Sequence, residues 1–213
     1  MAAEVFVKKA NILAIGAHPD DIEFGCGGTL IKYAEKGHNV YLLVMSNGEM
    51  GGGMETRRAE QEKAMSLIGA KELFWGSMID TRIDIRHETI EFIEGIIRKV
   101  KPNFIFCHYP VDTHQDHRHL AQMTISATRY IQNVLFYEGP TTERFDPHVY
   151  VDITRVLSRK VEILLAHGSQ VEKTNIENVS IVEIAHSCAN FRGIQGRTQY
   201  AEAFSAQRLF INI

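Results

Sequence analysis

Short apolar runs alternate along the chain with segments in which apolar residues recur at helical spacing. Runs of this kind, bounded by turn residues, are typical of buried strands in a parallel sheet. They cover residues 11–17, 39–46, 72–76 and 103–109. Helical spacing that ends at glycine or before proline predicts helices over residues 28–37, 56–70 and 87–100. This alternation predicts an α/β fold with an open, mostly parallel sheet.

The pattern is less regular after about Leu135. A turn-rich stretch over 137–154 precedes a predicted helix near 156–167, and a mixed helix and strand segment follows it. Since no internal repeat, low-complexity tract or linker divides the chain, we expect one domain over residues 1–213.

Composition narrows the class of protein. The net charge is −3 over 213 residues, with the basic residues scattered, so no surface for nucleic acid or anionic lipid is indicated. No apolar run approaches the roughly 18 residues of a membrane span, and the first residues lack the apolar core of a signal peptide. The three cysteines form no CxxC pair, which favours a reducing compartment. We therefore expect a cytoplasmic protein.

Polar residues gather directly after two of the predicted strands. One cluster, "HPDD", follows the first strand, and the other, "HYPVDTHQDHRHL", spans residues 108–120. Ligands bind at the carboxyl ends of the strands in open parallel sheets. We therefore expect the two clusters to meet in space although about ninety residues separate them in the sequence.

These clusters contain side chains that could form a catalytic zinc site. His18 and Asp21 lie three residues apart, and His117 can supply a third ligand from the other strand end. Two nitrogens and one carboxylate with an open fourth position are typical of catalytic rather than structural zinc. Asp20 is then placed to accept a proton from a zinc-activated water. His114, as an imidazolium, could stabilise an oxyanion.

Asp116 could act as the carboxylate partner of one of these histidines. Other interpretations of the clusters stay open. "HPDD" alone is also compatible with a turn in which Asp20 or Asp21 caps a helix. Two histidines and one carboxylate also hold iron in oxygenases, so the ligand types alone do not identify the metal, and Fe²⁺ or another divalent ion is an alternative to zinc. The glycines of "GCGGT" do not form the GxGxxG pattern of dinucleotide-binding proteins.

The order and spacing of these motifs resemble the LmbE/PIG-L family of metal-dependent deacetylases. "AHPDDIEFGCGGTL", "RRAE" and "HQDHRHL" carry the resemblance, and it continues through "SNGEMGGG", "GSMIDTRI", "FDPHVYVDIT", "LLAHGSQ" and "RGIQGRTQYAEAF". The resemblance implies a Rossmann-like α/β domain with helices on both faces of the sheet. It also implies a homo-oligomer, a trimer or hexamer, that removes acetyl groups from N-acetylglucosamine units of small conjugates.

The resemblance also implies a role for individual residues. It gives His18, Asp21 and His117 as zinc ligands, Asp20 as general base, His114 as oxyanion stabiliser and Asp116 as partner carboxylate. Arg57 matches the arginine that contacts substrate, with Arg58 as the competing choice, and Asp80 matches an acidic residue that binds sugar hydroxyls. Residues 51–53 are expected to form a mobile loop over the site, with a plain flexible connector as the alternative. Tyr109 and Tyr200 could each donate a hydrogen bond to substrate, but ordinary packing is the favoured explanation for both. His148, His167 and His186 are expected to be surface or core histidines, since no partner pattern surrounds them.

We therefore expect a zinc-dependent hydrolase that removes the N-acetyl group from an N-acetylglucosamine-type sugar or its conjugate. Two alternatives remain from the sequence. One is an amidase for sugar–thiol conjugates, and the other is a non-catalytic protein that binds metal or sugar at the same site.

Overall fold

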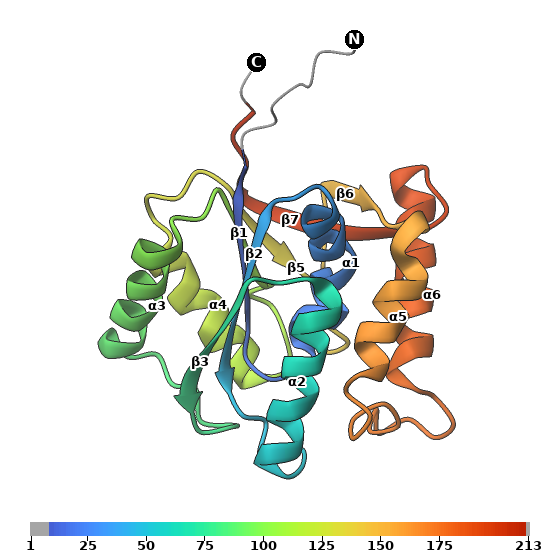
Figure 1. The fold of residues 1–213 in the computed structure, drawn as a ribbon, viewed down its shortest axis with the longest axis horizontal. Helices are drawn as coiled ribbons and strands as arrows, with labels where there is room; N and C mark the ends of the chain where they lie inside the picture. Colours follow the sequence, from blue (N-terminus) through green and yellow to red (C-terminus); the bar gives the residue numbers. More distant parts are fainter. Residues whose placement is uncertain (1–8, 212–213) are drawn as a thin grey trace.

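A seven-stranded sheet with helices on both faces forms the core of the computed structural model, which describes residues 9–211 (Figure 1). The prediction that the first residues do not form a signal peptide concerns residues 1–8, which lie outside the described part of the chain. The strand order is β3-β2-β1-β4-β5-β7-β6. The strands are β1 Asn11–Gly16, β2 Asn39–Ser46, β3 Glu72–Met78, β4 Phe104–His108, β5 Val134–Tyr137, β6 Val149–Asp152 and β7 Ala201–Arg208.

The helices connect and cover these strands. They are α1 Asp21–Glu35, α2 Met54–Ile68, α3 His87–Val100, α4 Gln115–Ala127, α5 Leu157–Leu165 and α6 Ile181–Gly196, with a short 3₁₀ turn at Thr154–Val156. Strands β1 to β5 pair in parallel, whereas β7 is antiparallel to both β5 and β6. The predicted open, mostly parallel α/β sheet is confirmed. Within residues 9–211, no helix has both the length and the apolar character that membrane crossing requires.

Successive residues of β1 face opposite sides of the sheet and divide the core into two layers. Ile12 and Ala14 pack beneath α1, α2, α5 and α6, whereas Leu13 and Ile15 pack beneath α3 and α4. Figure 1 shows these two groups of helices on opposite sides of the sheet. Because both faces are covered there, β1, β2 and β4 are almost continuously apolar, which is the pattern that predicted them.

Helix α1 begins at Asp21 rather than at residue 28, where apolar spacing placed its start. The glycines between these positions lie inside the helix and permit close packing. A Cβ atom on Gly25 would lie 2.1 Å from Cδ2 of Tyr137, and one on Gly27 would lie 2.4 Å from Cδ1 of Ile163. The glycine-rich stretch is therefore a packing surface of the helix, and it brings Asp21 into the first helical turn.

Strand β7 fixes the middle of α1. The carboxylate of Glu202 accepts hydrogen bonds from the backbone N–H groups of Gly28, at 2.8 Å, and Thr29, at 2.7 Å. The ammonium of Lys160 donates to Glu202 and to the carbonyl of Phe24. Both charged side chains are buried, so this ion pair joins α1, α5 and β7 inside the core.

Candidate metal centre and active site

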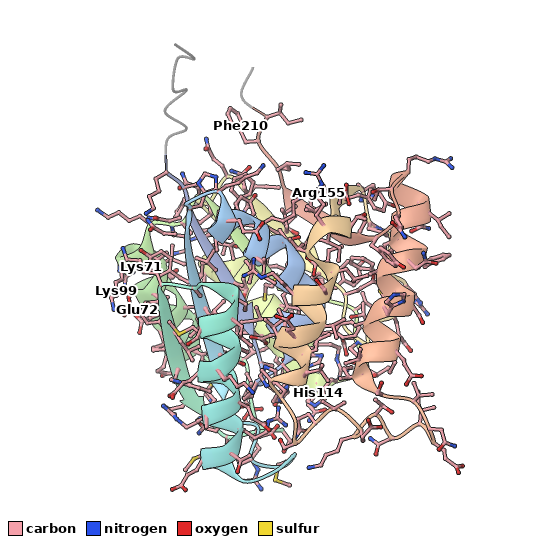
Figure 2. The ribbon with its side chains drawn as sticks, turned by 45° about the vertical axis from the view of Figure 1, so that its right-hand side comes forward. Lys71, Glu72, Lys99, His114, Arg155 and Phe210 are labelled. Atoms are coloured by element: carbon pink, nitrogen blue, oxygen red, sulfur yellow. The ribbon has the colours of Figure 1, made fainter. Side chains whose placement is uncertain are left out.

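The carboxyl ends of β1 and β4 bring the two polar clusters together. His18 follows β1, and His114 and His117 lie at the start of α4, a helix that apolar spacing did not predict. Figure 2 shows His114 at the end of the molecule opposite Phe210 and Arg155. A cavity of about 580 Å³ opens there, and its walls include most of the residues that the sequence singled out: His18, Asp20, Asp21, Arg57, Asp80, His114 and His117.

Asp21 lies between the two histidines expected to bind metal. Its Oδ2 is 3.4 Å from Nδ1 of His18, and its Oδ1 is 3.3 Å from Nε2 of His117. Two donors that are each about 2.0–2.1 Å from a tetrahedral zinc ion lie about 3.3–3.4 Å from each other. Each of these two distances is close to the separation of two ligand atoms on one divalent metal ion of this size. Among the described residues, three sets of side chains bring one ligand atom each to within 4.8 Å of one another: His18 with His114 and His117, Asp21 with His108 and His117, and His18 with Asp80 and Asp116.

Asp116 and Asp80 hold the imidazole of His18. Nε2 of His18 is 3.2 Å from Oδ2 of Asp116 and 3.0 Å from Oδ1 of Asp80. Asp116 in turn accepts hydrogen bonds from the backbone N–H groups of Thr81 and Ile83. A proton on Nε2 shared with these carboxylates leaves Nδ1 free to bind metal. Asp116 thus occupies the position of a partner carboxylate.

The second oxygen of Asp80 accepts from the backbone N–H of Met50 at 2.9 Å. Both oxygens of Asp80 therefore have partners within the protein, and its side chain lies against His18. Contact between Asp80 and a sugar hydroxyl stays a prediction.

Two residues of the candidate metal centre were not identified from the sequence. Asp112 Oδ2 is 3.3 Å from Nδ1 of His117, so Asp112 orients His117 as Asp116 orients His18. His108, the last residue of β4, stacks on His117 with ring centroids 4.0 Å apart, and its Nε2 is 3.1 Å from Oδ2 of Asp21. Both residues belong to the second polar cluster, and the many histidines and aspartates of that cluster were the signal from which they could have been identified.

The charges of the site reinforce one another. Burial disfavours the ionised form of Asp21, but the neighbouring His117 and His108 outweigh it and hold the pKa of Asp21 well below its ordinary value. Burial lowers the pKa of His108 to about 4, which keeps this ring neutral. Burial alone would lower the pKa of His18, but hydrogen bonds to Asp116, Asp21 and Asp80 outweigh it and raise that pKa well above the ordinary value. Such a concentration of carboxylates favours a bound cation.

Asp20 has a strained backbone and a guanidinium partner. Its φ of 96° lies in the left-handed region, which costs a non-glycine residue about 1–3 kcal/mol. Arg57 Nη2 donates to the carbonyl of Pro19 and lies 3.2 Å from Oδ2 of Asp20. The side-chain oxygen of Gln61 accepts from the backbone N–H of Asp20 at 3.3 Å. Burial raises the pKa of Asp20 to about 6, although Arg57 acts in the opposite direction.

Of the two arginines proposed from the sequence, the structure brings Arg57 to the cavity. Its side chain is buried beside Asp20. Arg58 instead donates to Oδ1 of Asn47 and lies over the ring of Trp75, 4.3 Å from its centroid. Arg58 is not among the residues that line the cavity.

His114 caps helix α4, and its protonation differs from the expected imidazolium. Its Nδ1 accepts a hydrogen bond from the backbone N–H of Asp116 at 3.2 Å, which assigns the proton to Nε2. Burial lowers the pKa of His114, and the neighbouring His117 and His18 lower it further. The geometry supports a neutral imidazole that can still donate from Nε2.

His167, for which the sequence showed no partner pattern, is a buried histidine that lies beside a carboxylate. The ring lies in the cavity wall, with Nε2 3.5 Å from Oε2 of the buried Glu23. Oε1 of Glu23 accepts from Nε2 of Gln61 at 2.6 Å, and Gln61 also contacts Asp20. His167 belongs to "LLAHGSQ", one of the segments that carried the family resemblance.

The remaining expectations concern the rim of the site. The carbonyl of Gly51 accepts hydrogen bonds from Gln170 at 3.1 Å and from Lys173, so the loop at residues 51–53 is joined to the connection between α5 and α6. Tyr109 and Tyr200 are not among the residues lining the cavity, which agrees with ordinary packing.

Comparisons with known proteins agree with the geometry. The model of a family described as "PIG-L: GlcNAc-PI de-N-acetylase" matches residues 13–128. The Escherichia coli (strain K12) protein named "Uncharacterized deacetylase YaiS" is 35% identical over 154 residues, or 68% of this chain and 83% of that protein. The diacetylchitobiose deacetylase of Thermococcus kodakarensis is 29% identical over 193 residues, and the match covers 78% of this chain and 72% of that enzyme.

A solved structure also has the same fold. It is the N,N'-diacetylchitobiose deacetylase of Pyrococcus horikoshii in complex with an inhibitor. The two structures superpose with a TM-score of 0.83 at 26% sequence identity. The match covers 94% of this chain and 84% of the Pyrococcus enzyme. The family match spans His18 to His117 and thus the whole candidate metal centre. The chain therefore belongs to the PIG-L family of deacetylases.

Proposed function

We propose that this protein is a divalent-metal-dependent hydrolase, with zinc as the expected metal, that removes the acetyl group from an N-acetylated amino sugar or its conjugate. The observation that carries the proposal is the position of Asp21 between His18 and His117, with Asp20 beside it, in one cavity. The deacetylase relatives support the reaction, and the diacetylchitobiose deacetylases support an acetamido sugar as substrate.

His18 through Nδ1, Asp21 and His117 through Nε2 would hold the metal. A divalent ion bound there supplies Lewis-acid chemistry, lowering the pKa of a water molecule and polarising the acetyl carbonyl. Fe²⁺ suits the same ligands. Asp112 and Asp116 keep the two imidazoles in the tautomers that this binding needs.

Asp20 is the proton acceptor in this mechanism. Its raised pKa of about 6 makes it a stronger base than an ordinary aspartate while it stays ionised at neutral pH. Asp20 takes a proton from the attacking water and returns it to the amine as the C–N bond breaks. His114 donates from Nε2 to the acetyl oxygen as negative charge develops there. Arg57 fixes the Asp20 carboxylate and, with Asp80, borders the space for the sugar.

Acetate release tests this proposal. Metal-stripped protein is assayed with N-acetylglucosamine and N,N'-diacetylchitobiose, with and without added Zn²⁺ or Fe²⁺. We expect acetate only when metal is present. Asp20→Asn is expected to keep one metal ion per chain and to lose at least about 100-fold in kcat. Asp84→Asn, an identical change at an exposed position, is the matched control and should retain full activity.

Two outcomes contradict parts of the proposal. Wild-type turnover by fully metallated Asp20→Asn protein would remove Asp20 from the role of base. Metal bound at one site without acetate from any acetamido sugar would favour the alternatives, an amidase for sugar–thiol conjugates or a non-catalytic binding protein. Those two are separated by assaying a sugar–thiol conjugate. A cytoplasmic location and a trimeric or hexameric assembly stay predictions.

A further inference from the structure

We infer that the substrate carries an apolar alkyl or aryl group on its amino sugar, and that this group binds an apolar wall of the cavity. The inference rests on the proposed function and names the class of substrate that the site selects. The apolar wall comprises Phe24, Leu164, Ile176, Ile181 and Ile184, all of which line the same cavity as His18 and Asp20.

The apolar wall begins next to the metal centre. Phe24 lies three residues after Asp21 on α1, and side chains at this spacing share one face of a helix. Leu164 of α5 and the first turn of α6 pack with Phe24 in one apolar cluster. A group attached to a sugar whose acetamide lies at Asp20 and Asp21 would therefore meet this wall within one helical turn.

Three polar side chains beside the apolar wall, those of Thr174, Gln170 and Lys173, already donate hydrogen bonds within the protein. Thr174 Oγ1 donates to the carbonyl of Val179 at 2.6 Å. Gln170 and Lys173 both donate to the carbonyl of Gly51. A second sugar in this position would bury hydroxyl groups that need partners, and burial without partners is costly. An alkyl or aryl group has no such requirement.

Ile176 gives the apolar wall an exposed surface that a ligand can cover. Its side chain is 57% exposed although it borders the cavity. Covering such a side chain removes apolar surface from water on both molecules. Except for Phe24, the wall lies outside residues 13–128, the part that matches the family model.

A series of substrates that differ only in chain length tests the inference. We would measure kcat/KM for acetate release from the methyl, butyl and hexyl glycosides of N-acetylglucosamine and from N,N'-diacetylchitobiose. Each fully buried methylene corresponds to about a four-fold gain. Allowing for partial burial, we expect the hexyl glycoside to exceed the methyl glycoside by at least about ten-fold, and to exceed diacetylchitobiose.

A matched pair of variants locates the effect. Ile176→Ser should lower the hexyl-to-methyl ratio by about three-fold or more, because it removes apolar contact from the wall. Ile194→Ser changes an isoleucine of similar exposure, 60%, at a position of α6 that does not line the cavity, and it should leave the ratio unchanged. Both sites are exposed, so neither change threatens the fold.

The possible outcomes distinguish failure of the apolar wall as a binding site from failure of the proposed deacetylase function. Acetate release at equal kcat/KM across the glycosides, or preference for diacetylchitobiose, would overturn the apolar wall as a binding site while leaving the deacetylase proposal intact. A chain-length effect that Ile176→Ser does not alter would also overturn it. Acetate from none of the compounds by metallated protein would overturn the proposed function and, with it, the inference.

Discussion

Replacing Arg57 by glutamine should move the acid limb of the pH–rate profile to higher pH. The guanidinium of Arg57 lies 3.2 Å from Asp20, and it favours the ionised carboxylate. At an effective dielectric constant of about 20, two unit charges at this distance attract each other by about 5 kcal/mol before solvent and neighbouring charges reduce the effect. A nearby arginine typically lowers an aspartate pKa by about 1–3 units.

The sign of the effect follows from the role of Asp20. A base works only when deprotonated, so the rate falls as pH falls through its pKa. With Arg57 present, that pKa is about 6. Without the guanidinium, the midpoint of the acid limb should lie about 1–3 units higher, and a bound metal displaces both midpoints downward without reversing their order.

The assay is kcat/KM for acetate release between pH 5 and 9.5, with metal content measured at each pH. Arg57→Lys retains a positive charge and serves as the control, and its midpoint should stay nearer that of the wild type. An Arg57→Gln midpoint equal to that of the wild type, at full metal occupancy, would refute the assignment of Arg57 as the charge that tunes Asp20.

Two further predictions concern metal affinity and stability. Asp112→Asn should weaken metal binding by about 10–100-fold, because the carboxylate orients His117; a competitive chelator titration measures this, and unchanged affinity would contradict the role. Lys160→Met should lower the free energy of unfolding by about 3–5 kcal/mol, because it leaves the buried Glu202 without its counter-ion. Urea denaturation measures the loss, and a loss below about 1 kcal/mol would contradict the buried pair.

Strands β1, β2 and β4 were predictable because they are buried on both faces and therefore almost continuously apolar, whereas β6 and β7, which are less buried and more polar, were not identified as strands. The start of α1 was not predictable, since glycine normally weakens a helix. In this helix, glycine is required because Gly25 packs against Tyr137 and Gly27 against Ile163. Both partners lie far from α1 in the sequence. Local sequence cannot reveal a close approach that tertiary packing creates.

The candidate site likewise contains residues that the sequence singled out and residues that it did not. His18, Asp21 and His117 were identifiable because their side chains follow strand ends at fixed short spacings. The orientation of His108 depends on which residue ends β4, and that of Asp112 depends on the turn before α4, a helix that apolar spacing did not predict. His167 enters the site from the connection after α5, where the pattern of apolar residues is least regular.

The contact between Glu202 and α1 has a consequence for the order of events during synthesis. The backbone donors of Gly28 and Thr29 find their carboxylate partner only in the last strand. A nascent chain that has left the ribosome only as far as α6 already contains every candidate metal ligand, yet lacks the group that secures the helix carrying Asp21. Competence to bind metal should therefore be acquired late in translation, after β7 has emerged and inserted between β5 and β6.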